Sequence, residues 1–208
     1  MATSTAWPII HEERRALLAD LRDIKPLDWS TQSLCPDWTV RDVFGHVIST
    51  ADTTPSKFIA GFAKSGFRFH RLNSARATAY LGASPEDQLA QFESLLDATT
   101  HPPGPIDAMV GESIVHGEDI RRPLGVTRDY PTSSLVRAAD FYKNSNLLIG
   151  SKSRIAGLTL TATDADWSTG AGDQVSGPML SLVMAMTGRK VAIADMAGPG
   201  VVSLRTRH

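Results

Sequence analysis

The sequence contains a single cysteine, Cys35, so the chain cannot form an internal disulfide. This fits a reducing compartment, and we expect the protein in the cytoplasm. The first residues lack a basic stretch followed by an apolar run, so they do not resemble a signal peptide. The longest apolar stretch, 179–186, is far shorter than the roughly 20 residues that a membrane helix needs. We therefore expect no association with a membrane.

An excess of charge of one sign is missing as well, since the formal net charge is -1. Such a balance gives no electrostatic attraction to phosphate backbones, and we expect no nucleic-acid partner. Several motifs are also absent: a Gly-rich phosphate loop, paired CxxC sequences, HExxH and Gly-x-Ser-x-Gly. Their absence removes the enzyme classes that depend on them.

What is present is a globular composition of 208 residues, 42% of them hydrophobic, which is enough to bury a substantial core. Apolar residues at helical spacing predict a first helix over 8–24 and a second over 40–48. Thr39 is placed to cap the second helix, and Asp42 in its first turn favours the same start. Between 55 and 80 the pattern predicts only a short helix and an irregular connection.

Two further helices are predicted in the middle of the chain. The sequence from Ser84, followed by proline and two acids, is a strong helix opening, and we expect this helix to run to about Thr99. Three prolines and a glycine within 101–105 then break the chain. The next helix contains Glu112 and His116 and is expected to stop before Pro123.

The pattern changes in the last third of the chain. A helix is predicted over 133–149, a half-buried strand over 158–163, turns over 164–173 and an apolar helix over 177–186. We therefore assign a helical domain to residues 1–148 and a small α+β module to residues 149–208.

Three side chains carry the chemistry that the pattern suggests. A four-residue helical step turns through roughly 400°, so Glu112 and His116 project from nearly the same face and can share one divalent ion. His46, on a helix with apolar neighbours, is the natural third ligand. The spacing alone leaves a plainer interpretation open, in which the pair is a surface contact or the histidine is an ordinary core residue with its hydrogen bonds satisfied. Asp119 lies three residues after His116 and is a candidate hydrogen-bond acceptor, a proton acceptor in catalysis, or an ordinary last-turn acid.

Three separated stretches resemble the mycothiol-dependent maleylpyruvate isomerase-like proteins of actinobacteria, within the DinB-like metalloenzyme superfamily. The first two are Cys35–His46, with the sequence CPDWTVRDVFGH, and Glu112–Gly125, with the sequence ESIVHGEDIRRPLG. The third is C-terminal and comprises Thr163–Trp167, Val175–Pro178 and Thr187–Arg189. The chain resembles a short form of the family, with only about 60 residues beyond the bundle.

The resemblance implies a DinB-like four-helix bundle with up-down-down-up order. It implies a metal site formed by His46, Glu112 and His116, with zinc as the first expectation and nickel, iron or manganese as others. Mycothiol is then the thiol cosubstrate, and a small electrophile is the substrate of an isomerase or thiol S-transferase. Asp119 resembles a proposed catalytic residue of the family, and Arg189 resembles a substrate-anion contact.

Two alternatives remain open at this stage. One is a DinB-like metal-dependent hydrolase, in which the open coordination position holds water. The other is a non-enzymatic stress-response protein that binds a metal. We expect a monomer or a homodimer.

Overall fold

The protein is described here by a computed structural model that covers residues 5–146 and 149–207. It divides into two compact units, Met1–Arg128 and Asp129–His208. This division falls before the boundary at residue 148 that the sequence suggested, because the helix Thr132–Tyr142 packs against the helix Met179–Met186 of the second unit. None of the described helices is long and apolar enough to cross a membrane.

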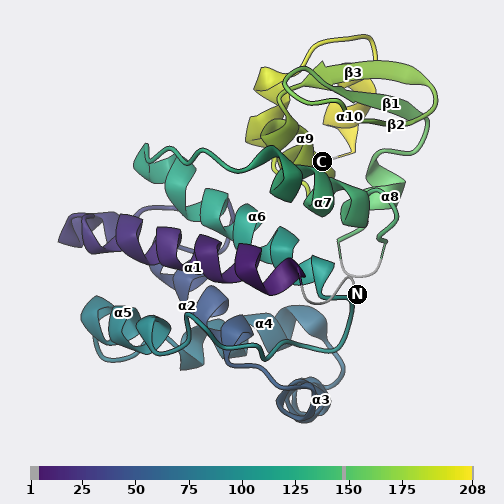
Figure 1. Ribbon diagram of the computed structural model, residues 1–208. Coiled ribbons are helices and arrows are strands. Elements are labelled where there is room, and N and C mark those ends of the chain that lie inside the picture. The colour runs from purple at the N-terminus through teal and green to yellow at the C-terminus, as the bar shows by residue number, and fades with distance from the viewer. Residues whose placement is uncertain (1–4, 147–148, 208) are drawn as a thin grey trace. The chain divides into compact units, whose positions relative to one another are not determined.

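The first unit is helical throughout (Figure 1). Its elements are α1 (Ala6–Arg22), η2 (Pro26–Ser30), α2 (Val40–Ala51), α3 (Pro55–Lys64), α4 (Phe69–Ala79), α5 (Pro85–Glu93) and α6 (Asp107–Leu124). Side chains of α1, α2, α5 and α6 meet in one core, to which Leu17, Phe44, Phe92 and Ile120 each contribute from a different helix. The mainly α fold with a helical bundle that the sequence predicted is confirmed.

Helix starts follow the sequence signals closely. Thr39 accepts a hydrogen bond from the Asp42 backbone N–H, and the Asp42 carboxylate accepts one from the Thr39 backbone N–H. Ser84 and Asp87 form the same reciprocal pair at the start of α5. These caps satisfy backbone donors that a helix start leaves unpaired, and they confirm both predicted starts.

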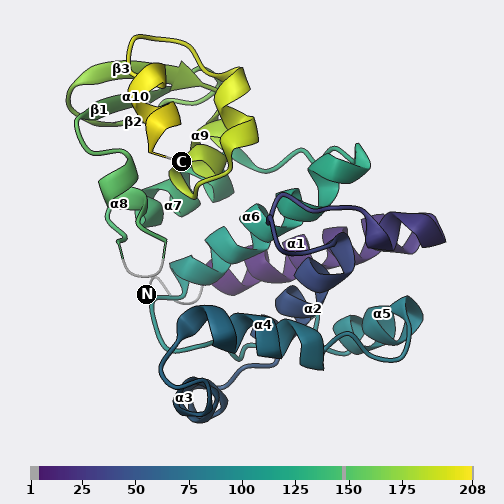
Figure 2. The same ribbon diagram turned by 180° about the vertical axis from the view of Figure 1, so that it is seen from behind.

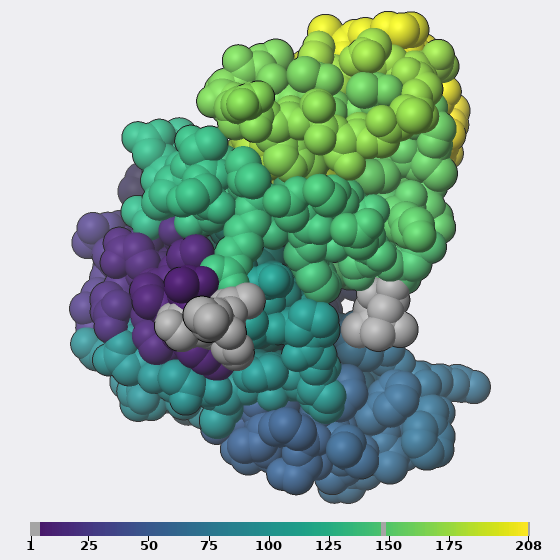
Figure 3. All heavy atoms as spheres, turned by 45° about the vertical axis from the view of Figure 1, so that its right-hand side comes forward, coloured from purple at the N-terminus to yellow at the C-terminus, as the bar shows by residue number. Residues whose placement is uncertain are grey.

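Two predictions for the middle of the chain are wrong. The 55–80 stretch forms two helices, α3 and α4, separated by a turn in which Gly66 and Phe67 adopt positive φ. α3 has no buried residue and lies at the outer edge of this unit, in blue in Figure 3. α4 buries only Leu72 and Ala77, so its sequence shows little of the apolar stripe by which helices are recognised. α5 ends at Glu93, because the following residues form tight turns.

Helix α6 does not stop before Pro123 but includes it and ends at Leu124. Proline lacks a backbone N–H and cannot bond to the carbonyl four residues earlier, which belongs to Asp119. That carbonyl accepts a hydrogen bond from the Leu34 N–H at 3.2 Å instead. The loss within the helix is therefore compensated by the loop before α2. Gly125, with φ of 68°, provides the left-handed cap.

The second unit combines helices with a small sheet, seen from behind in Figure 2. Its elements are α7 (Thr132–Tyr142), α8 (Ser151–Arg154), β1 (Leu158–Ala162), β2 (Ser168–Gly170), β3 (Asp173–Gly177), α9 (Met179–Met186), η3 (Lys190–Asp195) and α10 (Val201–Thr206). The strand order is β2-β1-β3, with β1 antiparallel to β2 and parallel to β3. The apolar helix α9 packs on the sheet and on α7.

The predicted strand and the predicted apolar helix of this unit are confirmed by β1 and α9. α7 ends at Tyr142, well before the predicted end at Ile149, because turns follow it. The 164–173 segment was predicted as turns only and contains the short strand β2. A strand of three residues is too brief to show an alternating pattern.

Gly45 sets how closely α2 approaches α4. A Cβ atom at this position would lie 2.6 Å from the Ala77 carbonyl oxygen, which is backbone and cannot rotate away. In Gly61 of α3, by contrast, a Cβ atom would meet only a methyl group of the Leu72 side chain, at 2.9 Å. Both glycines lie within helices, so alanine at each position compares a clash with backbone and a clash with a movable side chain.

We expect Gly45→Ala to lower the free energy of unfolding by about 1–3 kcal/mol, because the helices must separate. Gly61→Ala is expected to change it by less than about 1 kcal/mol, since improved helix propensity offsets the shift of one methyl group. Urea unfolding of both variants measures the difference. Equal effects at both positions would contradict the close contact of α2 with α4.

Candidate metal centre

His46 lies on α2, on the side that faces the core. Its neighbours Val43, Phe44 and Ile48 are fully buried, and His46 itself is only 6% exposed. The Trp38 ring lies 5.2 Å from the imidazole, measured between ring centroids. The capped start of α2 and this packing fix the direction of the imidazole.

Glu112 and His116 lie one turn apart on α6 and face His46. The Glu112 Oε2 atom is 3.3 Å from His116 Nε2 and 3.4 Å from His46 Nε2. The two imidazole centroids are 4.8 Å apart. The structure therefore brings together the three side chains that the sequence proposed, with one donor atom from each within 4.8 Å of the others.

Asp119 fixes the orientation of His116 from the other side of the ring. The His116 Nδ1 atom is 2.8 Å from Asp119 Oδ2, and the Asp119 side chain is fully buried. A carboxylate accepts hydrogen bonds but donates none, so His116 Nδ1 carries the proton. When the imidazole is neutral, Nε2 then holds the lone pair that faces Glu112 and His46.

Burial is the strongest influence on the pKa values of all three groups. It lowers the pKa of His46, against the opposing hydrogen bond to Glu112. Burial alone would raise the pKa of Glu112, but the charge of His116 and hydrogen bonds with both imidazoles place it well below its usual value. Burial likewise opposes the charged form of His116, yet Glu112 and Asp119 raise its pKa well above the ordinary value. A cation that binds here would displace the proton from His116 Nε2.

Cys35 belongs to the same neighbourhood, which the sequence reasoning missed. Its Sγ donates a hydrogen bond to Asp119 Oδ2 at 3.3 Å. Cys35, His116 and Asp119 form a second group with metal-binding side chains close together. The signal available in the sequence was the presence of Cys35 in the first matched stretch.

The first group fits a divalent cation better than the second. In the second group the Asp119 carboxylate already accepts hydrogen bonds from both Cys35 and His116 Nδ1. These three side chains therefore satisfy one another without an ion. His46 is different, because its buried Nδ1 has no hydrogen-bond partner among the described residues. Its main polar contact is therefore at Nε2, where a cation would bind. Two imidazole nitrogens and a carboxylate oxygen are suitable ligands for zinc and leave a coordination position open.

Arg189, the predicted anion contact, follows α9 in the second unit. Its Nη1 donates a hydrogen bond to the Thr187 carbonyl at 2.9 Å. The role of Arg189 towards a substrate stays a prediction.

These observations define a class of protein: a helical bundle in which two helices bring His, Glu and His to one point, followed by a small α+β unit. Residues 10–105 match the family model of the mycothiol maleylpyruvate isomerase N-terminal domain. This part of the chain is similar to that domain. The matched range includes His46 and ends before α6, which carries the other two side chains.

Two solved structures share the fold of nearly the whole chain. One is a histidine-to-alanine mutant of the mycothiol-dependent maleylpyruvate isomerase, with a TM-score of 0.66, 15% identity and coverage of 96% of this chain and 93% of that chain. The other is the mycothiol-dependent maleylpyruvate isomerase, with a TM-score of 0.64, 16% identity and coverage of 91% and 90%. No curated protein matches the sequence. The high coverage gives no support to the expected shortening of the C-terminal module.

We expect His46→Ala and His116→Ala each to lose divalent metal while the protein stays folded, because each removes one of three ligands. Cys35→Ser is the matched control and is expected to keep a full equivalent, since Cys35 belongs to the second group and is not one of the three ligands of the first. Element analysis of protein prepared without a histidine tag measures the metal. Retention by His46→Ala together with loss by Cys35→Ser would assign the cation to the second group.

Asp119→Asn is expected to weaken zinc binding about 10- to 100-fold, because the hydrogen bond that orients His116 is lost or reversed. A competition titration with a chromophoric chelator measures the affinity. Asp97→Asn, which changes an exposed carboxylate on the same unit, is the control. An unchanged affinity in Asp119→Asn would show that the imidazole is held by packing alone.

Proposed function

We propose that the protein is a metal-dependent enzyme that adds a low-molecular-weight thiol, mycothiol, to a small electrophile, as an isomerase or an S-transferase. The observation that carries the proposal is the convergence of His46, Glu112 and His116, with His116 oriented by Asp119. The domain similarity of residues 10–105 and the fold shared with a mycothiol-dependent isomerase support the choice of thiol.

The side chains have distinct tasks in this proposal. His46, Glu112 and His116 would hold the ion, with zinc first and nickel, iron or manganese as other candidates. A bound divalent cation would lower the pKa of a thiol that reaches it, so that thiolate is present near neutral pH. Asp119 holds the proton on His116 Nδ1 and acts through that ring, because its carboxylate is buried and accepts hydrogen bonds from Cys35 and His116.

The reaction begins with attack of thiolate sulfur on one carbon of a conjugated double bond. The π electrons of that bond move to the conjugated carbonyl oxygen as the carbon–sulfur bond forms. Rotation about the new single bond and expulsion of the thiolate return the isomerised double bond, with no net gain of protons. In a transferase the adduct takes up a proton and leaves. We also propose that Arg189 contacts an anionic group of the substrate. The cytoplasm is the proposed location, since it supplies the thiol in its reduced form.

The test combines calorimetry with thiol consumption. Zinc-loaded protein is expected to bind mycothiol, and removal of the metal with a chelator is expected to abolish that binding, because sulfur needs the cation as its partner. A panel of conjugated carbonyl compounds then reports turnover through loss of free thiol or isomerisation.

The control is protein stripped of metal and then reloaded, which is expected to recover thiol binding. Thiol binding that survives metal removal would contradict the proposal. Hydrolysis of esters or amides without thiol would favour a hydrolase, and zinc binding without any thiol binding would favour a non-enzymatic role.

A further inference from the structure

An exposed apolar surface lies on α3 and on the turn that follows it, at the outer edge of the first unit (Figures 1 and 3). Ile59 is 64% exposed and Phe67 is 73% exposed. Ala60 follows Ile59 directly, Ala63 lies one turn further on, and both are exposed. Single hydrophobic side chains on a surface are ordinary, whereas several on one helix and its turn form a candidate contact surface. We call these four residues the α3 patch.

The backbone of Phe67 is strained. Among the described residues it is the only one other than glycine with a positive φ, at 58°. Bulky side chains rarely adopt this left-handed conformation, because it costs free energy. The Phe67 ring touches the Phe62 ring edge-on, with centroids 5.5 Å apart, and otherwise faces solvent. The turn therefore holds a large aromatic ring at the surface, and strain of this kind is typical of positions that contact a ligand or partner.

The chain around the α3 patch is basic. Residues 53–85 contain five lysine and arginine residues and no aspartate or glutamate, although the whole protein has a formal net charge of -1. Lys64, Arg68 and Arg71 are exposed, and within the described part of the chain they form no ion pair. Three exposed cations therefore lie close in sequence to the exposed apolar side chains.

Acidic side chains reach this segment at two places. Asp52 binds Lys57, with Nζ to Oδ2 at 2.9 Å, and Asp37 lies 3.9 Å from His70. Neither carboxylate contacts the three exposed cations. The local charge of the segment is therefore positive.

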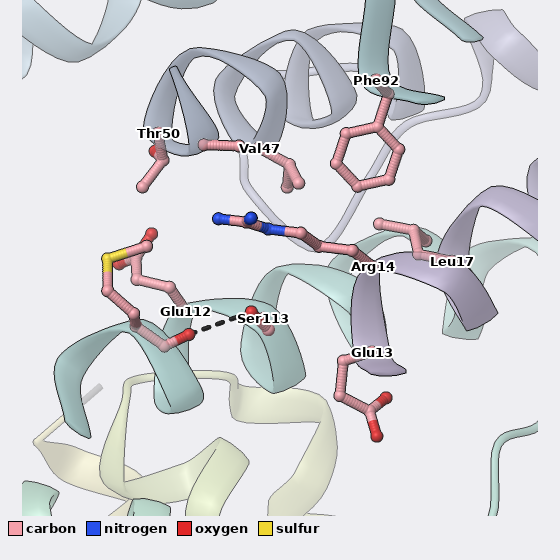
Figure 4. A pocket seen from close by; sticks show the side chains of 10 residues that line it. Glu13, Arg14, Leu17, Val47, Thr50, Phe92, Glu112 and Ser113 are labelled. Carbon is pink, nitrogen blue, oxygen red and sulfur yellow. Dashed lines mark hydrogen bonds between the residues drawn. The ribbon is translucent and has the colours of Figure 1, made fainter. Parts of the chain in front are cut away.

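Arg14 shows how a cation is accommodated in the interior of the same unit. It is 3% exposed and lies at a small cavity between α1, α2 and α6 (Figure 4). Its Nη1 donates to the carbonyls of Leu95 and Ala98, at 3.1 and 2.7 Å. Among the described residues, the cations beside the α3 patch make no such side-chain hydrogen bonds, so they are available to a partner outside the chain.

A second copy of the chain is a poor occupant of this surface. In a closed dimer the same surface of each copy faces its counterpart, so Lys64 and Arg68 would lie opposite their own equivalents. Like charges across such a contact cost free energy. The partner should instead carry negative charge and accept apolar side chains.

We propose that the α3 patch binds the surface of an anionic lipid membrane. Ile59 and Phe67 enter the boundary between headgroups and acyl chains, and the three neighbouring cations contact the headgroup phosphates. A helix with aliphatic and aromatic side chains beside lysine and arginine is typical of structures that lie in this boundary. An acidic protein would match the cations, but it would also need a pocket shaped for Phe67, which a fluid lipid surface does not.

This binding is peripheral and differs from the insertion of a spanning helix. We expected no membrane association because the sequence lacks a long apolar segment and has a balanced net charge, but both are properties of the whole chain. At physiological salt, a charge is screened beyond about 8 Å, so distant acidic residues do not cancel a local basic surface. The proposal does not depend on the metal centre or on the proposed reaction.

The test is sedimentation of the full-length protein with two kinds of vesicle. One kind contains equal parts of phosphatidylglycerol and phosphatidylcholine, and the other contains phosphatidylcholine alone. The protein is expected to bind the anionic vesicles about tenfold or more tightly, because each cation near an anionic surface is attracted to it. Added salt is expected to weaken this binding.

Substitutions in the α3 patch separate its apolar and charged parts. Phe67→Asn is expected to weaken vesicle binding about tenfold, because the apolar ring is lost, and asparagine tolerates the left-handed conformation. Phe67→Leu keeps an apolar side chain and is expected to retain most of the binding. Lys64→Gln and Arg68→Gln are each expected to weaken it about fivefold.

Two controls are matched to these changes. Leu27 is 83% exposed on η2 of the same unit and is followed by Asp28, so Leu27→Gln removes an exposed apolar side chain elsewhere. Arg22 is half exposed and pairs with Glu93 at 2.6 Å, so Arg22→Gln changes the net charge as Lys64→Gln does. Both controls are expected to bind as wild type. The unfolding midpoint and metal content of every variant are measured on the same samples.

The absence of binding to anionic vesicles overturns the proposal, and so does equal binding to both kinds of vesicle. Wild-type affinity in Phe67→Asn together with Lys64→Gln would place the contact elsewhere on the protein. Should Phe67→Asn not fold, Ile59→Gln takes its place. A dimer that Phe67→Asn dissociates, in protein that binds no vesicles, would assign the α3 patch to a second copy instead. Sedimentation velocity detects that dimer.

Discussion

The hydrogen bond between His116 Nδ1 and the buried Asp119 carboxylate is the contact on which the candidate centre depends. It places the proton of the ring on one nitrogen and leaves the other directed at Glu112 and His46. Glu112, His116 and Asp119 all lie on α6 within two helical turns, so ordinary helical geometry sets their spacing. Only His46 has to be supplied by another helix, and the core between α2 and α6 holds it there.

Pro123 connects the same part of α6 to the loop before α2, which is distant along the chain. By lacking an N–H, it leaves the Asp119 carbonyl free for Leu34, while the Asp119 carboxylate accepts from the neighbouring Cys35. One residue of α6 thus binds the loop before α2 through both its backbone and its side chain. A proline that looked like a helix stop in the sequence instead determines what the helix end binds.

Sequence alone predicted the helical class, the capped starts at Thr39 and Ser84, and the two faces that carry the candidate ligands. These features depend on local spacing, which a sequence displays directly. It did not predict two helices over 55–80, because α4 buries only Leu72 and Ala77, and it did not predict β2, which is too short to alternate. Contacts of Cys35 and Arg14 were missed for another reason, since their partners lie far away along the chain.

Arg14 nevertheless left a local sign, because it interrupts the apolar stripe of α1 between Ile10 and Leu17. Burying a guanidinium costs free energy unless hydrogen bonds and charge compensate it, and two backbone carbonyls satisfy only part of its donors. α1 and α6 pack against each other, so Arg14 and Glu112 enter one cavity from two rigid helices. The separation of these two side chains is therefore set by helix packing and not by a loop.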